Sequence, residues 1–137
     1  MSREILFRGK HVNALPGNRH LEGMWIYGYL SSEKYINSPE LEGEFLIDPK
    51  TVCQYTGLTD KNGRKIFEGD IVRYTDEVIG KEKVDEVKYN ETHSAFCRLH
   101  KGKMGLQYLF IDECIANKCE VIGNIFDNPE LLEEGTE

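Results

Sequence analysis

The chain has 137 residues, of which 39% are hydrophobic and 30% are charged, and its formal net charge is −7. This length predicts one domain with a single modest core, which we expect to span residues 1–137. An acidic chain does not attract polyanions through its overall field, so the composition disfavours sequence-independent binding of nucleic acid.

The amino-terminal third predicts two short strands separated by a polar loop. Residues 5–8 favour a strand, and residues 12–23 favour a loop because they contain Pro-Gly-Asn. The first residues hold no apolar run of signal length, and no segment is long enough to cross a bilayer. We therefore expect a cytoplasmic protein with reduced thiols.

Residues 24–30 alternate as a strand does. Trp25, Tyr27 and Tyr29 fall on one face, and Ile26, Gly28 and Leu30 fall on the other. The aromatic face could cover the core with its hydroxyl groups at the rim, which is the interpretation that the pattern favours. It could instead anchor a protein interface or stack nucleic-acid bases.

Residues 55–72 encode the clearest local structure. Asp60-Lys61-Asn62-Gly63 predicts a hairpin turn between extended runs at 55–59 and 64–68, because Asp accepts a nearby amide and Asn-Gly tolerates positive φ. The same residues with Glu68 resemble half of a calcium loop. The early Asp position is missing and the closing Glu comes one residue early, so we interpret the segment as a turn.

The second half predicts further strands and a short terminal helix. Residues 76–86 indicate a hairpin tip, and the strands expected after it are 84–89, 94–99, 105–111 and 120–126. Asn128 and Pro129 favour the start of a helix, as cap and first residue. We expect residues 133–137 to be disordered.

Residues that could carry chemistry are scarce. His93 and Cys97 would share a strand face while His100 points to the other, so this cluster disfavours a metal site. No local group activates the Cys97 thiol, and no glycine-rich loop ends in Gly-Lys-Ser/Thr. We expect no catalytic, cofactor-binding or metal-binding residues, no cofactor, and no enzymatic activity. The four cysteines lack Cys-x-x-Cys spacing, which argues against a zinc ribbon; they are Cys53, Cys97, Cys114 and Cys119.

Charge is unevenly spread along the chain. Residues 111–137 hold eight acids against Lys118 alone, whereas residues 91–110 have a net charge of +2. Arg98, Lys101 and Lys103 make this small basic patch. It fits a solvated hairpin end or, as an alternative, a site for nucleic acid.

A turn at Phe67-Glu68-Gly69-Asp70, followed by Ile71-Val72, resembles the diverging turn of SH3-like barrels. In such turns Gly supplies unusual backbone angles and Asp accepts hydrogen bonds from neighbouring amides. Since strands outnumber helices, we expect a mainly β protein. Its predicted fold is a small, partly open SH3-like β-barrel with additional strands and a short C-terminal α-helix.

The central stretch 55–72, together with motifs at 5–10, 25–30 and 121–132, resembles the YopX family of bacteriophage and prophage proteins. The resemblance covers nearly the whole chain and is weakest at 77–105. It implies a β-rich, barrel-like fold and a phage or prophage origin. It supplies no activity and no catalytic residues.

These observations predict a phage or prophage accessory protein of the host cytoplasm. We expect it to act without catalysis by binding another protein, with the acidic surface suited to a basic partner, or by self-assembly into an oligomer. The alternative is a nucleic-acid-binding SH3-like barrel. The sequence names neither the partner nor the oligomeric state.

Overall fold

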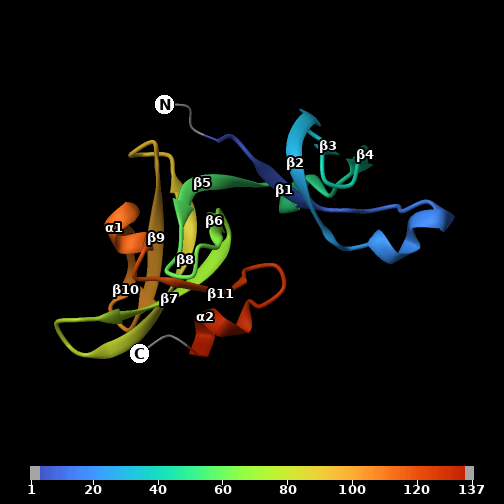
Figure 1. Cartoon of the computed structure of the whole chain (residues 1–137). Helices are drawn as coiled ribbons and strands as arrows, with labels where there is room; N and C mark the ends of the chain where they lie inside the picture. Colours follow the sequence, from blue (N-terminus) through green and yellow to red (C-terminus); the bar gives the residue numbers. More distant parts are fainter. Residues whose placement is uncertain (1–3, 135–137) are drawn as a thin grey trace. The chain divides into compact units, whose positions relative to one another are not determined.

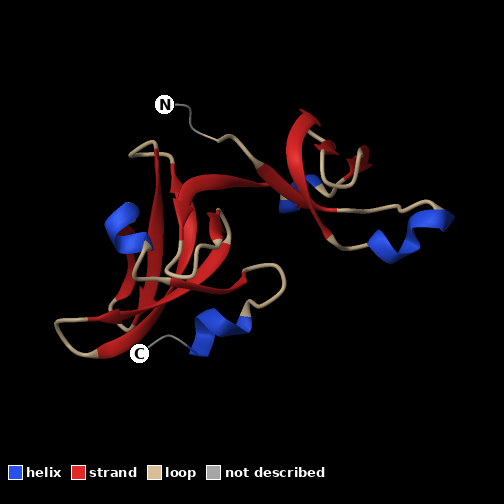
Figure 2. Cartoon of the chain, in the orientation of Figure 1, coloured by secondary structure: helices blue, strands red, loops and turns tan. Residues whose placement is uncertain are grey.

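The computed structural model describes residues 4–134 and confirms a mainly β chain, in which antiparallel strands greatly outnumber short helices (Figures 1 and 2). The strands are β1 (Phe7–Lys10), β2 (Trp25–Ser32), β3 (Tyr35–Ser38), β4 (Gly43–Leu46), β5 (Cys53–Thr59), β6 (Lys65–Phe67), β7 (Asp70–Asp76), β8 (Lys81–Asn90), β9 (Ala95–Gly102), β10 (Gly105–Phe110) and β11 (Glu120–Asn124). The helices are the 3-10 turns η1 (Pro16–Leu21) and η2 (Pro49–Thr51) and the α-helices α1 (Glu113–Ala116) and α2 (Glu130–Glu134). None of the helices within the described range is long and apolar enough to cross a membrane.

The chain divides into two compact units, and the boundary falls inside β5. The first unit ends at Tyr55 and the second begins at Thr56. Each has a hydrophobic cluster of its own. Two compact units can still fold together, so the single-domain expectation stays a prediction.

The first unit is an antiparallel sheet in the order β4-β3-β2-β1-β5. Ile26, Ile36 and Ile47 form its core, and each has 1% or less of its surface exposed. These β-branched residues suit strands because they pack well on a pleated surface. Phe7 and Phe45 pack against this cluster from neighbouring strands.

A glycine in β2 allows the sheet to close tightly over this core. A Cβ atom at Gly28 would overlap the backbone carbonyl oxygen of Asn37 on β3. No other residue type fits that approach without moving one of the two strands. The absence of a side chain at Gly28 is therefore required for β2 and β3 to pack this closely in the first unit.

The alternating face of β2 that packs inward is the aliphatic face. Ile26 is fully buried, whereas Tyr27 is 38% and Tyr29 is 51% exposed. The tyrosines therefore do not cover the core, and the pattern misled because three large aromatics suggested burial. Both side chains therefore lie at the surface of the first unit.

Replacing Ile26 by Ala should lower the free energy of unfolding by about 3 kcal/mol, because the change leaves a cavity in the small core. The Tyr29→Ala variant should change that free energy by less than about 1 kcal/mol, since half of the side chain is already exposed. Urea denaturation followed by circular dichroism measures both. A larger loss for the Tyr29 variant would contradict this assignment of faces.

The second unit is a five-stranded antiparallel sheet in the order β10-β9-β8-β7-β11, together with β6, which pairs with β5 at the end of the six-stranded order β4-β3-β2-β1-β5-β6. Its core draws on the five-stranded sheet, β6 and α1, and the buried members are Ile66, Val72, Val87, Ala116, Cys119 and Val121. Neither sheet closes into a barrel, because each strand order ends at two edges. The SH3-like likeness stays a prediction.

Several element boundaries differ from the expected ones. β8 begins at Lys81, because its charged residues still pair with β7, and this leaves only 77–80 as the hairpin tip. The loop 12–23 contains η1, and the short helix α1 had no periodic signal from which to predict it. Residues 133–134 belong to α2, while 135–137 of the expected disordered tail lie outside the described residues.

Asn128 does not cap the terminal helix with its side chain as expected. Its Oδ1 accepts a hydrogen bond from the backbone N–H of Asn124 at 3.2 Å instead. Only its backbone oxygen contacts the helix, where it accepts from the N–H of Leu131. The side chain thus closes the loop after β11.

The turn at 60–63 is held by one buried carboxylate. Asp60 is 3% exposed, and its Oδ1 accepts the backbone N–H groups of Asn62 and Arg64, each at 2.9 Å. Its Oδ2 accepts the N–H of Val121 on β11, also at 2.9 Å. Gly63 supplies the left-handed backbone that the turn needs, with φ of 80°. The carboxylate thereby joins the hairpin to the last strand.

The second turn, at 67–70, has a similar construction. The Oδ2 of Asp70 accepts the backbone N–H of Phe67 at 2.7 Å, and Gly69 has a φ of 86°. Gly69 also donates its N–H to the carbonyl of Val87 and accepts the N–H of Ile125. This glycine therefore connects the start of β7 to two distant parts of the unit.

The Asp60→Ala variant should lose about 3 kcal/mol or more of unfolding free energy, because three hydrogen bonds to a charged acceptor are removed and amides are left unpaired. Asp112→Ala is the matched control. That exposed carboxylate caps α1 by accepting one N–H, from Ile115, so its loss should cost about 1 kcal/mol. Equal losses in chemical denaturation would contradict the special role of Asp60.

Candidate functional site

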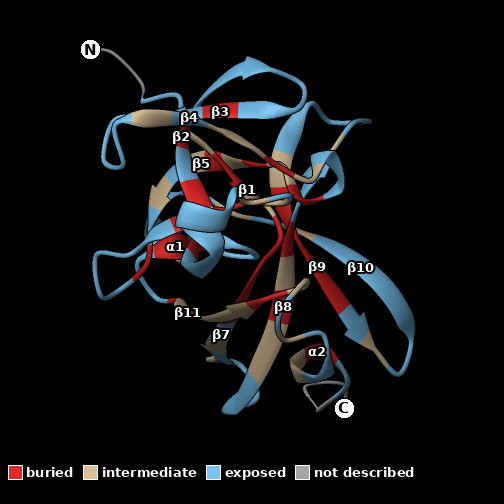
Figure 3. Cartoon of the chain, turned by 90° about the vertical axis from the view of Figure 1, so that its right-hand side faces the viewer, coloured by how far each residue is buried: buried red, intermediate tan, exposed pale blue. Residues whose placement is uncertain are grey.

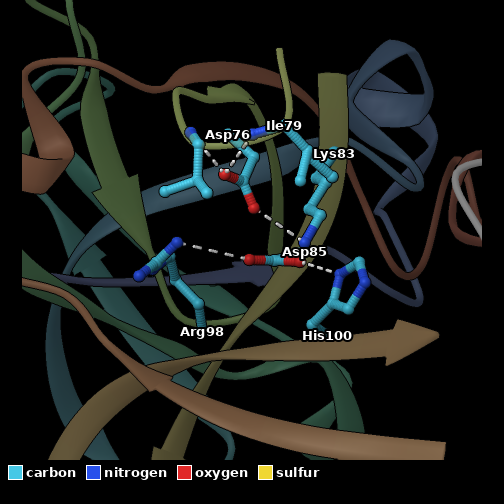
Figure 4. A network of polar contacts seen from close by, with 7 residues as sticks. Asp76, Ile79, Lys83, Asp85, Arg98 and His100 are labelled. Atoms are coloured by element: carbon cyan, nitrogen blue, oxygen red, sulfur yellow. Dashed lines mark hydrogen bonds and ion pairs between the residues drawn. The ribbon is translucent and has the colours of Figure 1, made fainter. Parts of the chain in front are cut away.

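A buried carboxylate in the second unit holds two basic side chains. Asp85 on β8 is fully buried, and its Oδ1 lies 2.7 Å from Nδ1 of His100 on β9. Its Oδ2 lies 3.6 Å from Nη1 of Arg98, also on β9. Figure 4 shows Asp85 between these two residues. The three side chains form a charged network inside a mainly apolar unit.

Arg98 is fixed by further contacts. Its Nε donates a hydrogen bond of 2.6 Å to the backbone oxygen of Phe110, and its guanidinium lies 4.9 Å from the ring centre of Tyr74. Burial, with the nearby Asp85 carboxylate, raises the pKa of the Tyr74 hydroxyl. Arg98 is thus a structural cation, buried on three sides by β7, β8 and β10 partners.

Strand register explains how these polar groups meet. Asp85 pairs directly with His100, and Val87 pairs with Arg98. Residues opposite each other share a face, so all four lie on the face that carries the core valines. A sequence pattern assigns charged strand residues to solvent, and it gave no signal that this acid and these bases lie in adjacent strands.

The network can orient one imidazole. An ionised carboxylate can only accept, so Nδ1 of His100 donates to Asp85 and the ring is held with Nε2 directed away from it. His100 also lines an open hollow of about 670 Å³ with Lys83 and Lys103. Lys83 in turn contacts the carboxylate of Asp76 at 2.9 Å (Figure 4). Together these groups place a fixed histidine at a basic surface depression.

A different feature lies at the edge of the same sheet. Leu106, Tyr108 and Phe110 on β10 are 64%, 53% and 85% exposed. They alternate along the strand and therefore share one face. Within the described residues β10 pairs with β9 alone, and Figure 3 shows its exposure along most of its length. A groove of about 300 Å³ adjoins its end at Tyr108 and Phe110.

The residues expected in a basic patch separate in the structure. Lys101 and Lys103 are exposed, whereas Arg98 is 8% exposed and paired as described above. In the first unit, Trp25 is accompanied by two cations. The guanidinium of Arg8 lies 4.5 Å and the Lys10 ammonium 5.4 Å from its ring centre.

The cysteines and histidines expected not to form a site are dispersed. Within residues 4–134, no group of three or more His, Cys, Asp or Glu residues could hold a metal ion. Cys97 lines the groove beside β10, whereas His100 lines the hollow. Burial raises the pKa of the Cys119 thiol to about 11 and also raises the pKa of Cys97, which keeps both thiols protonated near neutral pH.

Comparison with known proteins identifies the family. The family model described as YopX protein matches residues 16–133. The chain belongs to the YopX family. Curated proteins gave no match. Among solved structures, the crystal structure of protein EF1440 from Enterococcus faecalis matches with 23% identity over 96% of this chain and 99% of that chain, with a TM-score of 0.48.

Proposed function

We propose that this YopX-family chain is a phage or prophage accessory protein that acts without catalysis, as a self-assembling protein-binding module of the host cytoplasm. Its binding surface is the edge strand β10, which pairs with β10 of a second copy of the chain. The observation that carries the proposal is the exposed apolar row Leu106, Tyr108 and Phe110.

An edge strand exposes unpaired backbone N–H and C=O groups that can pair with another strand. Natural edges are usually protected by charge, by proline or by a covering element. The segment 105–110 contains no charged residue and no proline. Adding a strand there would satisfy the free backbone groups and cover the exposed apolar side chains.

The sequence of β10 suits pairing with itself. In an antiparallel pair of identical strands centred on Tyr108, Leu106 lies opposite the partner's Phe110 and the two tyrosines face each other. Aromatic pairs of this kind stabilise antiparallel sheets. Such an interface is the same on both copies and closes as a dimer. No charge lies opposite a like charge within the segment 105–110.

Analytical ultracentrifugation tests this pairing. The native chain should sediment as a concentration-dependent dimer. Tyr108→Lys should raise the dissociation constant at least about tenfold, because two like charges would then face each other at the centre of the interface. The melting temperature of the monomer should change little, since Tyr108 is half exposed.

Val78→Lys is the matched control. Val78 is 93% exposed in the turn between β7 and β8, away from the β10 edge, so its substitution should leave dimerisation unchanged. A native chain that stays monomeric up to its solubility limit, or a Tyr108→Lys chain that dimerises as well as the native one, would overturn the proposal.

Nucleic-acid binding is the second candidate, and one observation in the first unit favours it. Trp25, with Arg8 and Lys10 beside its ring, lies on the same face of β2 as the exposed Tyr27 and Tyr29. Exposed aromatics near cations form platforms on which single-stranded bases stack. The buried position of Arg98 removes one residue from the basic patch on which this alternative first rested.

Trp25 is the single tryptophan of the chain, so its fluorescence reports directly on this face. If the alternative holds, a single-stranded oligonucleotide should quench it at low salt, and the affinity should fall as salt rises. Tyr29→Ala should weaken binding about tenfold. Tyr89→Ala, which changes an exposed tyrosine of the second unit, should have no effect. Absence of quenching at low salt would exclude this candidate.

A further inference from the structure

Three adjacent strands bring Asp85, His100 and Gln107 into one row. His100 on β9 pairs directly with Asp85 on β8 and with Gln107 on β10. The three side chains therefore share one face of the sheet. Asp85 is fully buried and Gln107 is exposed, so the row leads from the interior to the surface with His100 between.

His100 is held from its inner side. Its Nδ1 contacts the Asp85 carboxylate at 2.7 Å, while only 10% of the side chain is exposed. Its Nε2 has no hydrogen-bond partner among the described residues, and the ring lines the open hollow. A buried carboxylate on one ring nitrogen orients the imidazole. Nε2 is thus held at the hollow, where it can contact a bound group.

The remaining lining of the hollow is basic or neutral. It includes Lys83, Lys103 and Gln107, together with Gly102 and Gly105, and no acidic side chain. Two carboxylates contact these bases. Asp85 lies under His100, and Asp76 accepts from Lys83 at 2.9 Å. The contact with Lys83 lowers the pKa of Asp76.

We propose that this hollow is a binding site for a tetrahedral oxyanion of the phosphate class. The imidazolium form of His100 would donate from Nε2, Lys103 supplies an ammonium group, and Gln107 can donate from its amide. Lys83 also lines the hollow and raises the local electrostatic potential, although its ammonium group remains paired with Asp76. The site is local, because the chain as a whole has a net charge of −7 and does not attract anions.

The charged and polar groups around His100 come from several strands. The groups that face His100 are Asp85 and Lys83 from β8, Arg98 from β9, Gln107 from β10 and Lys103 from the turn, with Tyr74 of β7 behind Arg98.

NMR spectroscopy of the imidazole ¹H–¹⁵N correlations, with inorganic phosphate titrated at constant ionic strength against chloride, tests the site. The Nε2 resonance of His100 should shift in a saturable way. Lys103→Ala should weaken binding about 3-fold to 10-fold, because one nearby charge is lost.

Lys101→Ala is the matched control. Lys101 lies on the same strand as His100 but on the opposite face, and it does not line the hollow. Its loss should leave phosphate affinity unchanged. His100→Gln would remove the observed resonance itself, so the comparison of Lys103→Ala with Lys101→Ala carries the test. A linear, unsaturating shift or equal weakening by both lysine variants would overturn the proposal.

Discussion

The second unit depends on the carboxylate of Asp60. Its two oxygens join three backbone amides, two from its own hairpin turn and one from Val121 on β11. A second link runs beside it, from the N–H of Lys61 to the carbonyl of Cys119. The hairpin of β5 and β6 carries Ile66 into the core beside Val121. The turn therefore sets where the last strand pairs, and an apolar core forms around that position.

The sequence was most informative where structure is local. Asp60 and Gly63 predict the hairpin because an acceptor and a residue that allows positive φ lie within four positions. Strands were also predicted near β5, β9 and β10, from short extended runs in the sequence. The helix α1 was missed, since four residues give no helical period, and β2 was oriented wrongly because its largest residues face solvent.

The polar network shows why the candidate site was harder to predict. His100 was considered with its neighbours in sequence, His93 and Cys97, whereas its partner Asp85 lies 15 residues away on another strand. Arg98 was assigned to a surface patch because a charged residue is rarely buried unless it is paired. Pairing depends on register, and register is fixed by tertiary contacts. The family resemblance could identify the chain, which belongs to the YopX family, but it carried no information on these contacts.

The hydrogen bonds of the Asp60 carboxylate also bear on how the chain folds while the ribosome synthesises it. Val121 follows Asp60 by 61 residues, so at roughly 5–20 residues per second the carboxylate waits about 3–12 s for its last partner. Strands β1 to β4 of the first unit all precede Tyr55 and can pair with one another during that interval. The second unit can complete its fold only when β11 has left the exit tunnel. A nascent chain that stops before residue 121 would thus carry one finished unit and one that lacks its final strand.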